Sequence, residues 1–389
     1  MKAFTNHMDE IKLSGIRVIG ERAAALAAQG RKIIKLQVGE PDFPTPQHTI
    51  EAAVASLENC DTHYTPNRGI LALREAIAEK LEKDNGIAYD PKDEILVLNG
   101  CAEALYCAVN GLVDPGEEVI IIEPAFLSYE QIVLLAHAHP VVVHAREENG
   151  WLPKAEDIEK AISAKTRMII LNTPTNPTGV VYPQELLSQI AALAVKHDLF
   201  VASDEVYEKL VYGKKHISIA ALEGMRERTV TINGFSKAYA MTGWRLGYVA
   251  APRELTLAML KVHQYTSTCL PAFGQKGAVD AIRNSDADVE DMRLEYERRR
   301  DILMEYFEGC SAISLVKPDA TFYMYLNIEK SGMDSTTFCS RLLEEKGVAI
   351  VPDTAFDHQG KYNVRLSFAS DEASLREGAE KICQLATGK

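Results

Sequence analysis

The sequence predicts an α/β fold, in which a large doubly wound domain with a mostly parallel sheet carries a smaller α+β domain at its C-terminal end. Three observations support this prediction. Short runs rich in β-branched residues alternate with stretches of helical periodicity. The runs are apolar throughout, which is typical of strands buried on both faces. After about residue 290 the alternation gives way to a long charged helix followed by short strands.

Six apolar runs are predicted as strands of the large sheet. They cover residues 94–98, 118–122, 140–145, 167–171, 199–203 and 229–232. Stretches such as PQELLSQIAALAVKHD lie between several of them and have the period of a helix with one buried face. Strand, helix and strand in this order form βαβ units around a parallel sheet. We therefore expect one large domain from residue 46 to residue 290.

The two ends of the chain are expected to pack together beside this domain. Residues 291–389 should form the small domain, with strands at TFYMYLNI and YNVRLSFA and a last helix from residue 371. The charged segment DVEDMRLEYERRRDILMEYFEG predicts a long amphipathic helix leading into it. Residues 1–45 carry a predicted helix over 16–29 and a strand at IIKLQVG, and we expect both to join the small domain.

Composition excludes several classes of protein. The 389 residues carry a formal net charge of -13, which argues against a broad nucleic-acid-binding surface. The seven cysteines are scattered without a CxxC pair, so we expect no disulfide framework and a reducing, cytoplasmic location. No apolar run reaches the roughly 18 residues of a membrane span, and the N-terminus has no signal-peptide core. The sequence predicts no metal site.

Two loops at predicted strand ends contain residues suited to ligand binding. In NGCAEAL (99–105), Gly100 permits a tight turn, and the small residues Cys101 and Ala102 leave the first helix amides open to a phosphate. Such turns also serve for packing alone. In NTPTNPTG, Asn176 offers a donor and an acceptor at the carboxyl end of a strand, where α/β sheets place ligands. An ordinary Asx turn explains the same residues.

Two further segments bring charged side chains to strand ends. In SDEVYEKLVY, Asp204 is either a buried carboxylate facing a ring cation or the N-cap of a helix, and Tyr207 follows three residues later. In INGFSKAYAMTGWRLGYVAAP, Lys237 follows a strand and a small-residue turn, and Arg245 comes eight residues later. An amine that reacts as a nucleophile must lose its proton, and desolvation and a nearby arginine both favour that loss. A surface lysine and a structural arginine are the alternative.

Seven motifs occur in the order and spacing of one known family. They are VGEPDF, HYTPNRG, NGCAEAL, NPTG, SDEVYE, SKAYAMTGWRLGY and NVRLSFA. From about residue 10 to its end, the chain resembles the class I, fold-type-I aminotransferases of the aspartate/aromatic group, which depend on pyridoxal 5′-phosphate. The resemblance implies a large domain with a mostly parallel seven-stranded sheet and a smaller α+β domain.

The resemblance implies catalytic roles for three residues. Lys237 would carry the cofactor as a Schiff base and later move the proton. Asp204 would bond the pyridinium nitrogen, and Tyr207 would hold the phenolate oxygen together with Asn176. A protonated pyridinium makes the cofactor a stronger electron sink, and the charge of Asp204 would favour that proton.

Further residues would bind the phosphate, the ring and the substrate. The phosphate ligands that the resemblance implies are Gly100, Cys101, Ala102, Ser236 and Arg245. Phe126 would stack on the pyridine ring. Tyr64 would reach the phosphate of the neighbouring subunit, which implies a homodimer with shared active sites. Arg365 would clamp the substrate α-carboxylate, with the backbone of Gly39 and the amide of Asn176 assisting.

Two positions depart from the family pattern. Gly234 stands where relatives often carry a Ser or Thr as a phosphate ligand, so one contact is missing or replaced. Ala102 stands where some aspartate-specific relatives have a lysine that reads the distal carboxylate, which leaves strict aspartate specificity open. Arg68 and Ser14 are candidate substitutes, and each also fits an ordinary surface or capping role.

The expected reaction transfers the amino group of an L-amino acid (aspartate, aromatic or similar) to a 2-oxo acid such as 2-oxoglutarate, by a ping-pong route. A β-lyase or a cyclopropane-carboxylate synthase on the same fold is one alternative, since such enzymes share the cofactor residues. A non-catalytic regulatory version of the fold is another, and intact Lys237, Asp204 and Arg365 argue against it. A nucleotide-dependent dehydrogenase would need a GxGxxG turn after a strand, which the sequence lacks.

Overall fold

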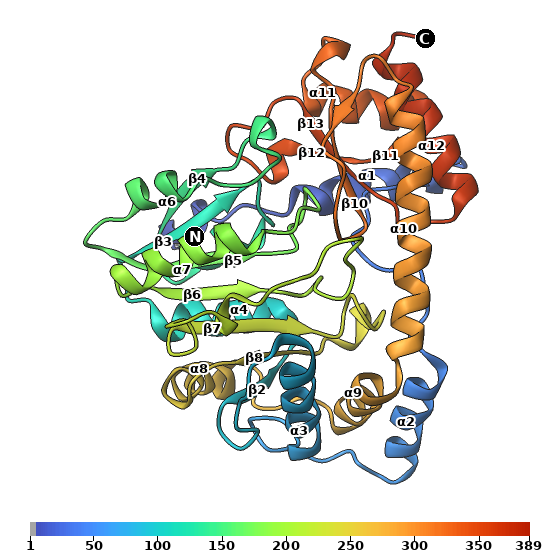
Figure 1. Cartoon of the computed structure of the whole chain (residues 1–389). Helices are drawn as coiled ribbons and strands as arrows, with labels where there is room; N and C mark the ends of the chain where they lie inside the picture. Colours follow the sequence, from blue (N-terminus) through green and yellow to red (C-terminus); the bar gives the residue numbers. More distant parts are fainter. Residues whose placement is uncertain (1–4) are drawn as a thin grey trace.

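A computed structural model describes residues 5–389, and a seven-stranded sheet forms its centre (Figure 1). The strand order is β2-β8-β7-β6-β5-β3-β4. The strands are β2 (Ile95–Leu98), β3 (Glu118–Glu123), β4 (His139–His144), β5 (Thr166–Asn172), β6 (Phe200–Asp204), β7 (Thr229–Gly234) and β8 (Gly247–Ala250). Only β8 runs antiparallel to its neighbours, β2 and β7. The predicted α/β class with a mostly parallel sheet is therefore confirmed.

Helices cover both faces of this sheet, because its strands are apolar on both sides. One face packs against α4 (Gly100–Leu112), α5 (Ser128–Leu135) and α8 (Arg253–Thr266). The other face packs against α6 (Ala155–Ala161) and α7 (Gln184–Lys196). The end of the sheet formed by β2 and β8 is covered by α3 (Leu71–Lys80) and α9 (Ala272–Asn284), and α2 (Gln47–Glu58) packs on α9.

A second, antiparallel sheet of four strands forms the smaller layer. Its order is β12-β13-β10-β9, with β9 (Ser314–Leu315), β10 (Tyr323–Asn327), β12 (Val351–Pro352) and β13 (Asn363–Ser367). The helices around it are α10 (Asp286–Glu308), α11 (Ser335–Arg341) and α12 (Glu372–Ala386). The long helix α10 begins beside α9 and continues to the small sheet (Figure 1). It therefore connects the two layers as one rigid element.

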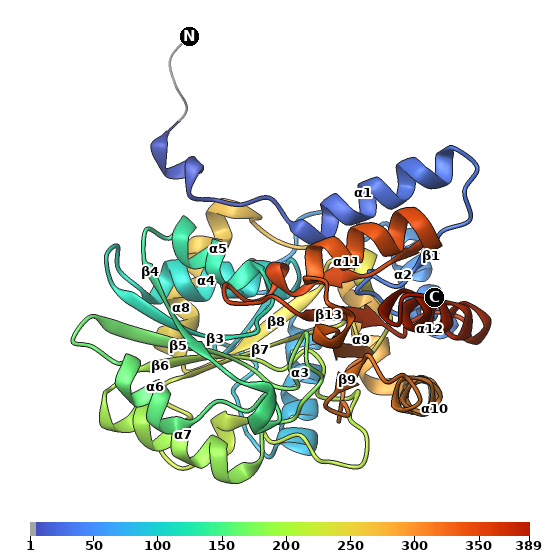
Figure 2. The same cartoon turned by 90° about the horizontal axis from the view of Figure 1, so that it is seen from above.

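The N-terminal segment packs on the small layer. Helix α1 (Gly15–Ala28) lies beside α11, where Arg22 Nη1 donates to Ser340 Oγ at 3.1 Å (Figure 2). The predicted strand at IIKLQVG is shorter than expected. Only β1 (Ile34–Lys35) pairs, with β11 (Val348–Ala349), because β11 itself offers just two residues. The division of the chain at residues 45 and 290 stays a prediction.

Short helical turns complete the described chain. They are Asn6–Asp9, Leu81–Asn85, Glu147–Asn149, Ile219–Ala221, Thr242–Trp244, Glu329–Ser331, Leu342–Lys346 and Asp353–Ala355. Across residues 5–389, none of the helices combines the length and the apolar character that a membrane crossing requires.

Candidate active site

The carboxyl ends of the parallel strands meet at the edge of the large sheet that faces the small one (Figure 1). Asp204 ends β6, and Lys237 follows the end of β7 by three residues. Asn176 lies in the loop after β5, and Gly100 opens α4 directly after β2. Arg365 comes from β13 of the small sheet. Open α/β sheets bind ligands at this edge, so the topology alone brings these residues together.

Lys237 lies in a mostly aromatic environment between the two sheets. Its Nζ donates a 2.5 Å hydrogen bond to the carbonyl oxygen of Gly39. The same atom lies 5.8 Å from the ring centre of Tyr207 and 5.7 Å from that of Phe322. Within the described chain no carboxylate forms an ion pair with this amine. A carbonyl oxygen and two ring faces hold the amine in place.

Asp204 is a buried carboxylate that forms no ion pair with a cationic side chain among the residues that the structure describes. The hydroxyl of Tyr129 donates to Asp204 Oδ2 at 2.8 Å, and the amide of Val206 donates to Oδ1 at 3.3 Å. Burial raises the pKa of Asp204 to about 6, although these two hydrogen bonds lower it in part. A buried carboxylate in this state is stabilised by any cation that binds next to it. The residues after Asp204 form a turn rather than a helix, so the helix-cap alternative does not apply.

The Tyr207 hydroxyl is paired with that of Tyr323 from β10 at 3.1 Å. Both rings are buried, and burial raises the pKa of Tyr207 well above its ordinary value. Tyr323 also explains a glycine in the VGEPDF motif. A Cβ on Gly39 would lie 2.7 Å from the Tyr323 hydroxyl oxygen, so a side chain at residue 39 would displace that hydroxyl.

Arg365 is fully buried and points its guanidinium between two aromatic rings. The guanidinium carbon lies 4.3 Å from the ring centre of Tyr323 and 4.8 Å from that of Phe356. Its Nη1 donates to Asn176 Oδ1 at 2.9 Å, and its Nη2 donates to the carbonyl oxygen of Gln37 at 3.0 Å. The buried Nε has no hydrogen-bond partner. A buried guanidinium without a carboxylate is suited to bind one from a ligand.

The turn before α4 forms a tight cradle. Gly100 has φ +73°, and a Cβ there would lie 2.6 Å from Nη2 of Arg245. A Cβ on Gly247 would lie 2.7 Å from the carbonyl carbon of Gly100. Ala102 and Arg245 are exposed to solvent, so the first turn of α4 and the guanidinium are accessible together. Free amides and an arginine at one helix start favour a phosphate.

Glu103 lies in the first turn of α4 and would repel an anion if its carboxylate faced the cradle. That carboxylate accepts from the Asn99 amide at 2.6 Å, from Ser267 Oγ at 2.7 Å, and pairs with His263 Nδ1 at 3.0 Å. Burial raises its pKa, yet the hydrogen bonds from His263, Asn99 and Ser267 together lower it to about 2. The Glu103 carboxylate therefore caps the start of α4 and pairs with His263, rather than facing an anion in the cradle.

The departure at Gly234 has a local explanation. A Cβ on Gly234 would lie 2.9 Å from the carbonyl oxygen of Leu246 and 3.1 Å from the sulfur of Cys101. Cys101 therefore fills the space beside the β7 terminus. Ser236, the neighbour of Lys237, is buried.

Three predicted or candidate residues lie away from this centre in the described chain. Tyr64 is 91% exposed. Arg68 donates through Nη1 to the Asp93 carbonyl at 2.9 Å and to Thr256 Oγ1 at 3.3 Å, so it serves local structure rather than a ligand. Ser14 caps α1 by accepting from the Arg17 amide at 3.4 Å.

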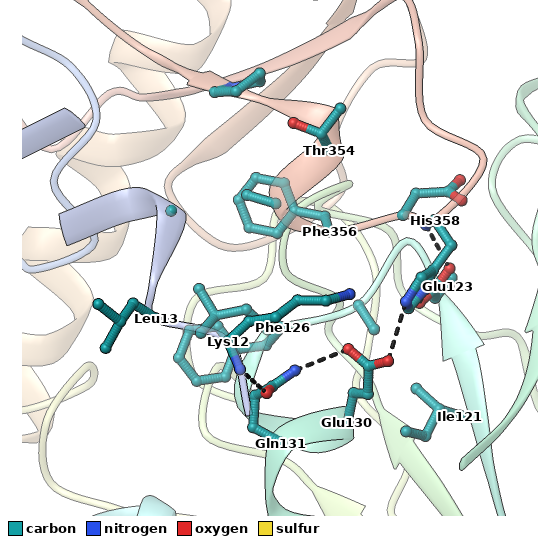
Figure 3. A pocket seen from close by; sticks show the side chains of 16 residues that line it. Lys12, Leu13, Ile121, Glu123, Phe126, Glu130, Gln131, Thr354, Phe356 and His358 are labelled. Atoms are coloured by element: carbon teal, nitrogen blue, oxygen red, sulfur yellow. Dashed lines mark hydrogen bonds and ion pairs between the residues drawn. The ribbon is translucent and has the colours of Figure 1, made fainter. Parts of the chain in front are cut away.

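A cavity of about 210 Å³ opens beside the centre. Figure 3 shows Phe126 and Phe356 in it, with Lys12 and Leu13 from the N-terminal segment. Phe356 packs on Arg365. Phe126 packs edge-on against the ring of Tyr129, with ring centres 5.9 Å apart. The cavity therefore lies between two rings: Phe356, which packs on Arg365, and Phe126, which packs on Tyr129, the donor to Asp204.

Four aromatic residues of this site were not identified from the sequence: Tyr129, Phe322, Tyr323 and Phe356. Tyr129 follows Phe126 by three residues, and its amide donates to the Phe126 carbonyl at 3.1 Å. That spacing is a signal that could have found it. Tyr323 and Phe356 reach the site only because β10 and the turn before β13 fold back onto the large sheet.

Comparisons with known proteins agree with this geometry. The family model described as aminotransferase class I and II matches residues 31–382. The aspartate aminotransferase of Pyrococcus abyssi is 43% identical over 98% of this chain and 97% of its own. The aromatic-amino-acid aminotransferase 2 of Thermococcus litoralis is 42% identical over the same shares. The solved structure of the aspartate aminotransferase from Thermus thermophilus with maleate superposes with a TM-score of 0.95, at 38% identity over 99% of this chain and 100% of that one. The chain therefore belongs to the class I and II aminotransferases, in the aspartate/aromatic subgroup.

Proposed function

We propose that this aminotransferase binds pyridoxal 5′-phosphate at Lys237 and moves the amino group of an L-amino acid to a 2-oxo acid. The observation that carries the proposal is the buried carboxylate of Asp204, which forms no ion pair within residues 5–389 and lies at the same sheet edge as Lys237. The family implies this cofactor, and the residues present fit it. A ring cation would meet Asp204, and the cradle at Gly100 and Arg245 is suited to a phosphate.

Each part of the cofactor has residues that would hold it. The phosphate would be bound by Gly100, Cys101, Ala102, Ser236 and Arg245, with Tyr64 of a second subunit. Asn176 and Tyr207 would hold the ring oxygen, and Phe126 would cover one face of the ring. When bound, the cofactor supplies an electron sink for the pair left behind at Cα.

The chain's own groups then perform positioning and proton transfer. Arg365 would bind the α-carboxylate through its planar fork, which Asn176 already orients by a 2.9 Å hydrogen bond. The Nζ of Lys237 would take the Cα proton of the donor and, in the second half-reaction, deliver a proton to Cα of the product. Asp204 would hold a proton on the ring nitrogen, and Tyr129 orients Asp204 for that task.

For the substrate we propose an aromatic amino donor with 2-oxoglutarate as acceptor. The cavity beside Arg365 presents the rings of Phe126 and Phe356, which suit an aromatic side chain. Among the described residues, Lys12 is the only Lys or Arg that lines this cavity, and it would receive the distal carboxylate of 2-oxoglutarate. Arg68 does not take this role, since its guanidinium is used elsewhere.

The test is a panel of donors and acceptors assayed with purified protein. We expect tyrosine and phenylalanine to be converted with formation of glutamate, at a higher kcat/KM than aspartate. Ammonia release without any oxo acid would instead identify a β-lyase. Borohydride reduction followed by peptide mapping should place the cofactor on Lys237, and an adduct on another lysine would overturn that assignment. Lys237→Ala should lose transamination.

We further propose a homodimer with shared active sites and a cytoplasmic location. The exposed ring of Tyr64 supports the first, because an exposed aromatic side chain is suited to a subunit interface. The seven free cysteines support the second.

A further inference from the structure

A cluster of two histidines and three carboxylates lies at the far rim of the cavity and takes no part in the proposed reaction. Glu123 ends β3, His144 ends β4, and Asp357 follows the short helix before β13. His358 and Glu130 flank them (Figure 3). These residues are far apart in the sequence, so the sequence pattern alone predicts no metal site here.

The three central ligand atoms have the separations that a small cation requires. Nδ1 of His144 lies 3.3 Å from Asp357 Oδ1 and 3.8 Å from Glu123 Oε2. All three groups place a ligand atom within 4.8 Å of the others. Tetrahedral ligands at about 2.1 Å from zinc are about 3.4 Å apart, so only small shifts would close the site.

A second observation concerns His144 alone. Its buried Nδ1 forms no hydrogen bond within the described residues, although it lies at ion-pair distance from the carboxylates of Asp357 and Glu123. A buried ring nitrogen without a partner is uncommon and calls for an explanation. A metal ion between this nitrogen and the carboxylates would satisfy it.

The surrounding residues orient the ligands as in known metal sites. His358 Nδ1 pairs with Glu123 Oε1 at 2.6 Å, and the His358 amide donates to Oε2 at 2.9 Å. His358 Nε2 in turn lies 3.0 Å from Glu130 Oε1. Such outer hydrogen bonds fix the orientation and basicity of metal ligands.

The charge of the cluster also favours a cation. Within the described chain, no Lys or Arg forms an ion pair with Glu123, Glu130 or Asp357, whose ion-pair partners are histidines alone. A divalent ion would supply the missing positive charge.

We propose that Glu123, His144 and Asp357 bind a divalent cation of the zinc type, with one coordination position left for water. The site joins the ends of β3 and β4 to the loop that carries Phe356, the residue packed on Arg365. An ion there ties the small layer to the large sheet. The inference does not depend on the proposed substrate.

Isothermal titration of the chelator-treated, full-length holoenzyme with Zn²⁺, and separately Mn²⁺, tests the proposal. We expect one tight Zn²⁺ per chain and weaker Mn²⁺, since an imidazole ligand favours zinc. His144→Gln and Asp357→Asn should each weaken Zn²⁺ binding at least about a hundredfold, and His358→Gln should weaken it about 10- to 100-fold. The matched control is His139→Gln, an exposed histidine that begins the same strand, and it should bind like the wild type.

Thermal unfolding provides a second measurement on the same proteins. Added Zn²⁺ should raise the midpoint of the wild type and of His139→Gln, and leave those of His144→Gln and Asp357→Asn unchanged. Equal Zn²⁺ affinity in the wild type and both ligand variants would overturn the proposal, as would the absence of tight binding. Retained transamination in a variant that has lost zinc separates this outcome from a failure of the proposed function.

Discussion

The hydroxyl of Tyr129 donates a 2.8 Å hydrogen bond to Oδ2 of Asp204, and both groups are buried. This contact joins the start of α5 to the end of β6, across the face of the sheet that α5 covers. It makes Tyr129 the only side-chain donor to the Asp204 carboxylate in the described chain. The orientation of the carboxylate therefore depends on a residue from another element.

Replacing Tyr129 with Phe tests that dependence. A hydrogen bond to a charged group is worth about 1.5–3 kcal/mol, so we expect kcat to fall about tenfold or more. Without this donor the pKa of Asp204 should rise further above its ordinary value, and the acid limb of the pH–rate profile should shift to higher pH. Tyr106→Phe, on α4, is the matched control. An unchanged acid limb in Tyr129→Phe would show that the contact does not position Asp204.

Replacing Asp204 with Asn removes the charge and keeps the shape. We expect the rate of the first half-reaction to fall at least about a hundredfold, which corresponds to about 2.7 kcal/mol of transition-state stabilisation. Asp204→Glu should keep a larger share of activity. Single-turnover kinetics with bound cofactor measure the effect. A near wild-type rate in the Asn variant would remove Asp204 from the chemistry.

The raised pKa of Asp204 predicts a pH-dependent stability of the cofactor-free protein. Its folded pKa is about 6 against an ordinary value of 3.8, so its contribution is fully present below about pH 4 and is lost as the pH rises through 6. A gap of about two pKa units is worth about 3 kcal/mol. The free energy of unfolding of the wild type, minus that of Asp204→Asn, should therefore decrease between pH 4 and pH 7 and then stay level. Urea titrations across this range measure it, and a difference independent of pH would contradict the buried state of Asp204.

Replacing Arg365 with Lys keeps a positive charge and removes the fork. A lysine cannot bond Asn176 and Gln37 while also meeting a carboxylate with two parallel donors, so we expect kcat/KM to fall about a hundredfold or more. Most of the loss should appear in KM for the amino donor. Arg376→Lys, exposed on α12, should leave both constants unchanged. Equal kinetics in the two variants would remove Arg365 from substrate binding.

Tyr64 is tested by mixing inactive subunits. If each site combines Lys237 of one chain with Tyr64 of the other, Tyr64→Ala and Lys237→Ala chains form hybrids with one intact site, and activity should return on mixing. Mixing Lys237→Ala with Asp204→Asn chains creates no intact site and is the control. A fully active monomer in light scattering, or no recovery on mixing, would refute the shared site.

The pattern of strands was largely predictable, and its failures have physical reasons. The six predicted runs correspond to β2–β7, since strands buried on both faces are apolar throughout. β8 was missed because its four residues, GYVA, lie at the end of a motif interpreted for its chemistry. The strand at IIKLQVG was overextended, because pairing depends on the partner strand, and β11 is only two residues long.

The predicted site residues lie on loops and strand ends whose place follows from sheet topology. The residues that surround them in space cannot be derived from sheet topology. Tyr323 and Phe356 surround Arg365 only through the register of the small sheet, where β10 pairs Tyr325 with Arg365. The contact between His144 and Asp357 also does not follow from the order of the strands, because the two residues belong to different layers.

Gly234 shows how packing limits which side chains fit at one position of the site. The family resemblance implies a hydroxyl side chain at this position, and a Cβ here would lie 2.9 Å from the Leu246 carbonyl, 3.0 Å from Gly247 Cα and 3.1 Å from the Cys101 sulfur. Two of these atoms belong to the backbone and cannot yield by a rotamer change. A Ser or Thr placed at residue 234 alone would therefore force the backbone of β8 to shift. A hydroxyl side chain at residue 234 would therefore need two further changes, a shift of β8 and a smaller residue 101, so this position cannot be altered independently of its neighbours.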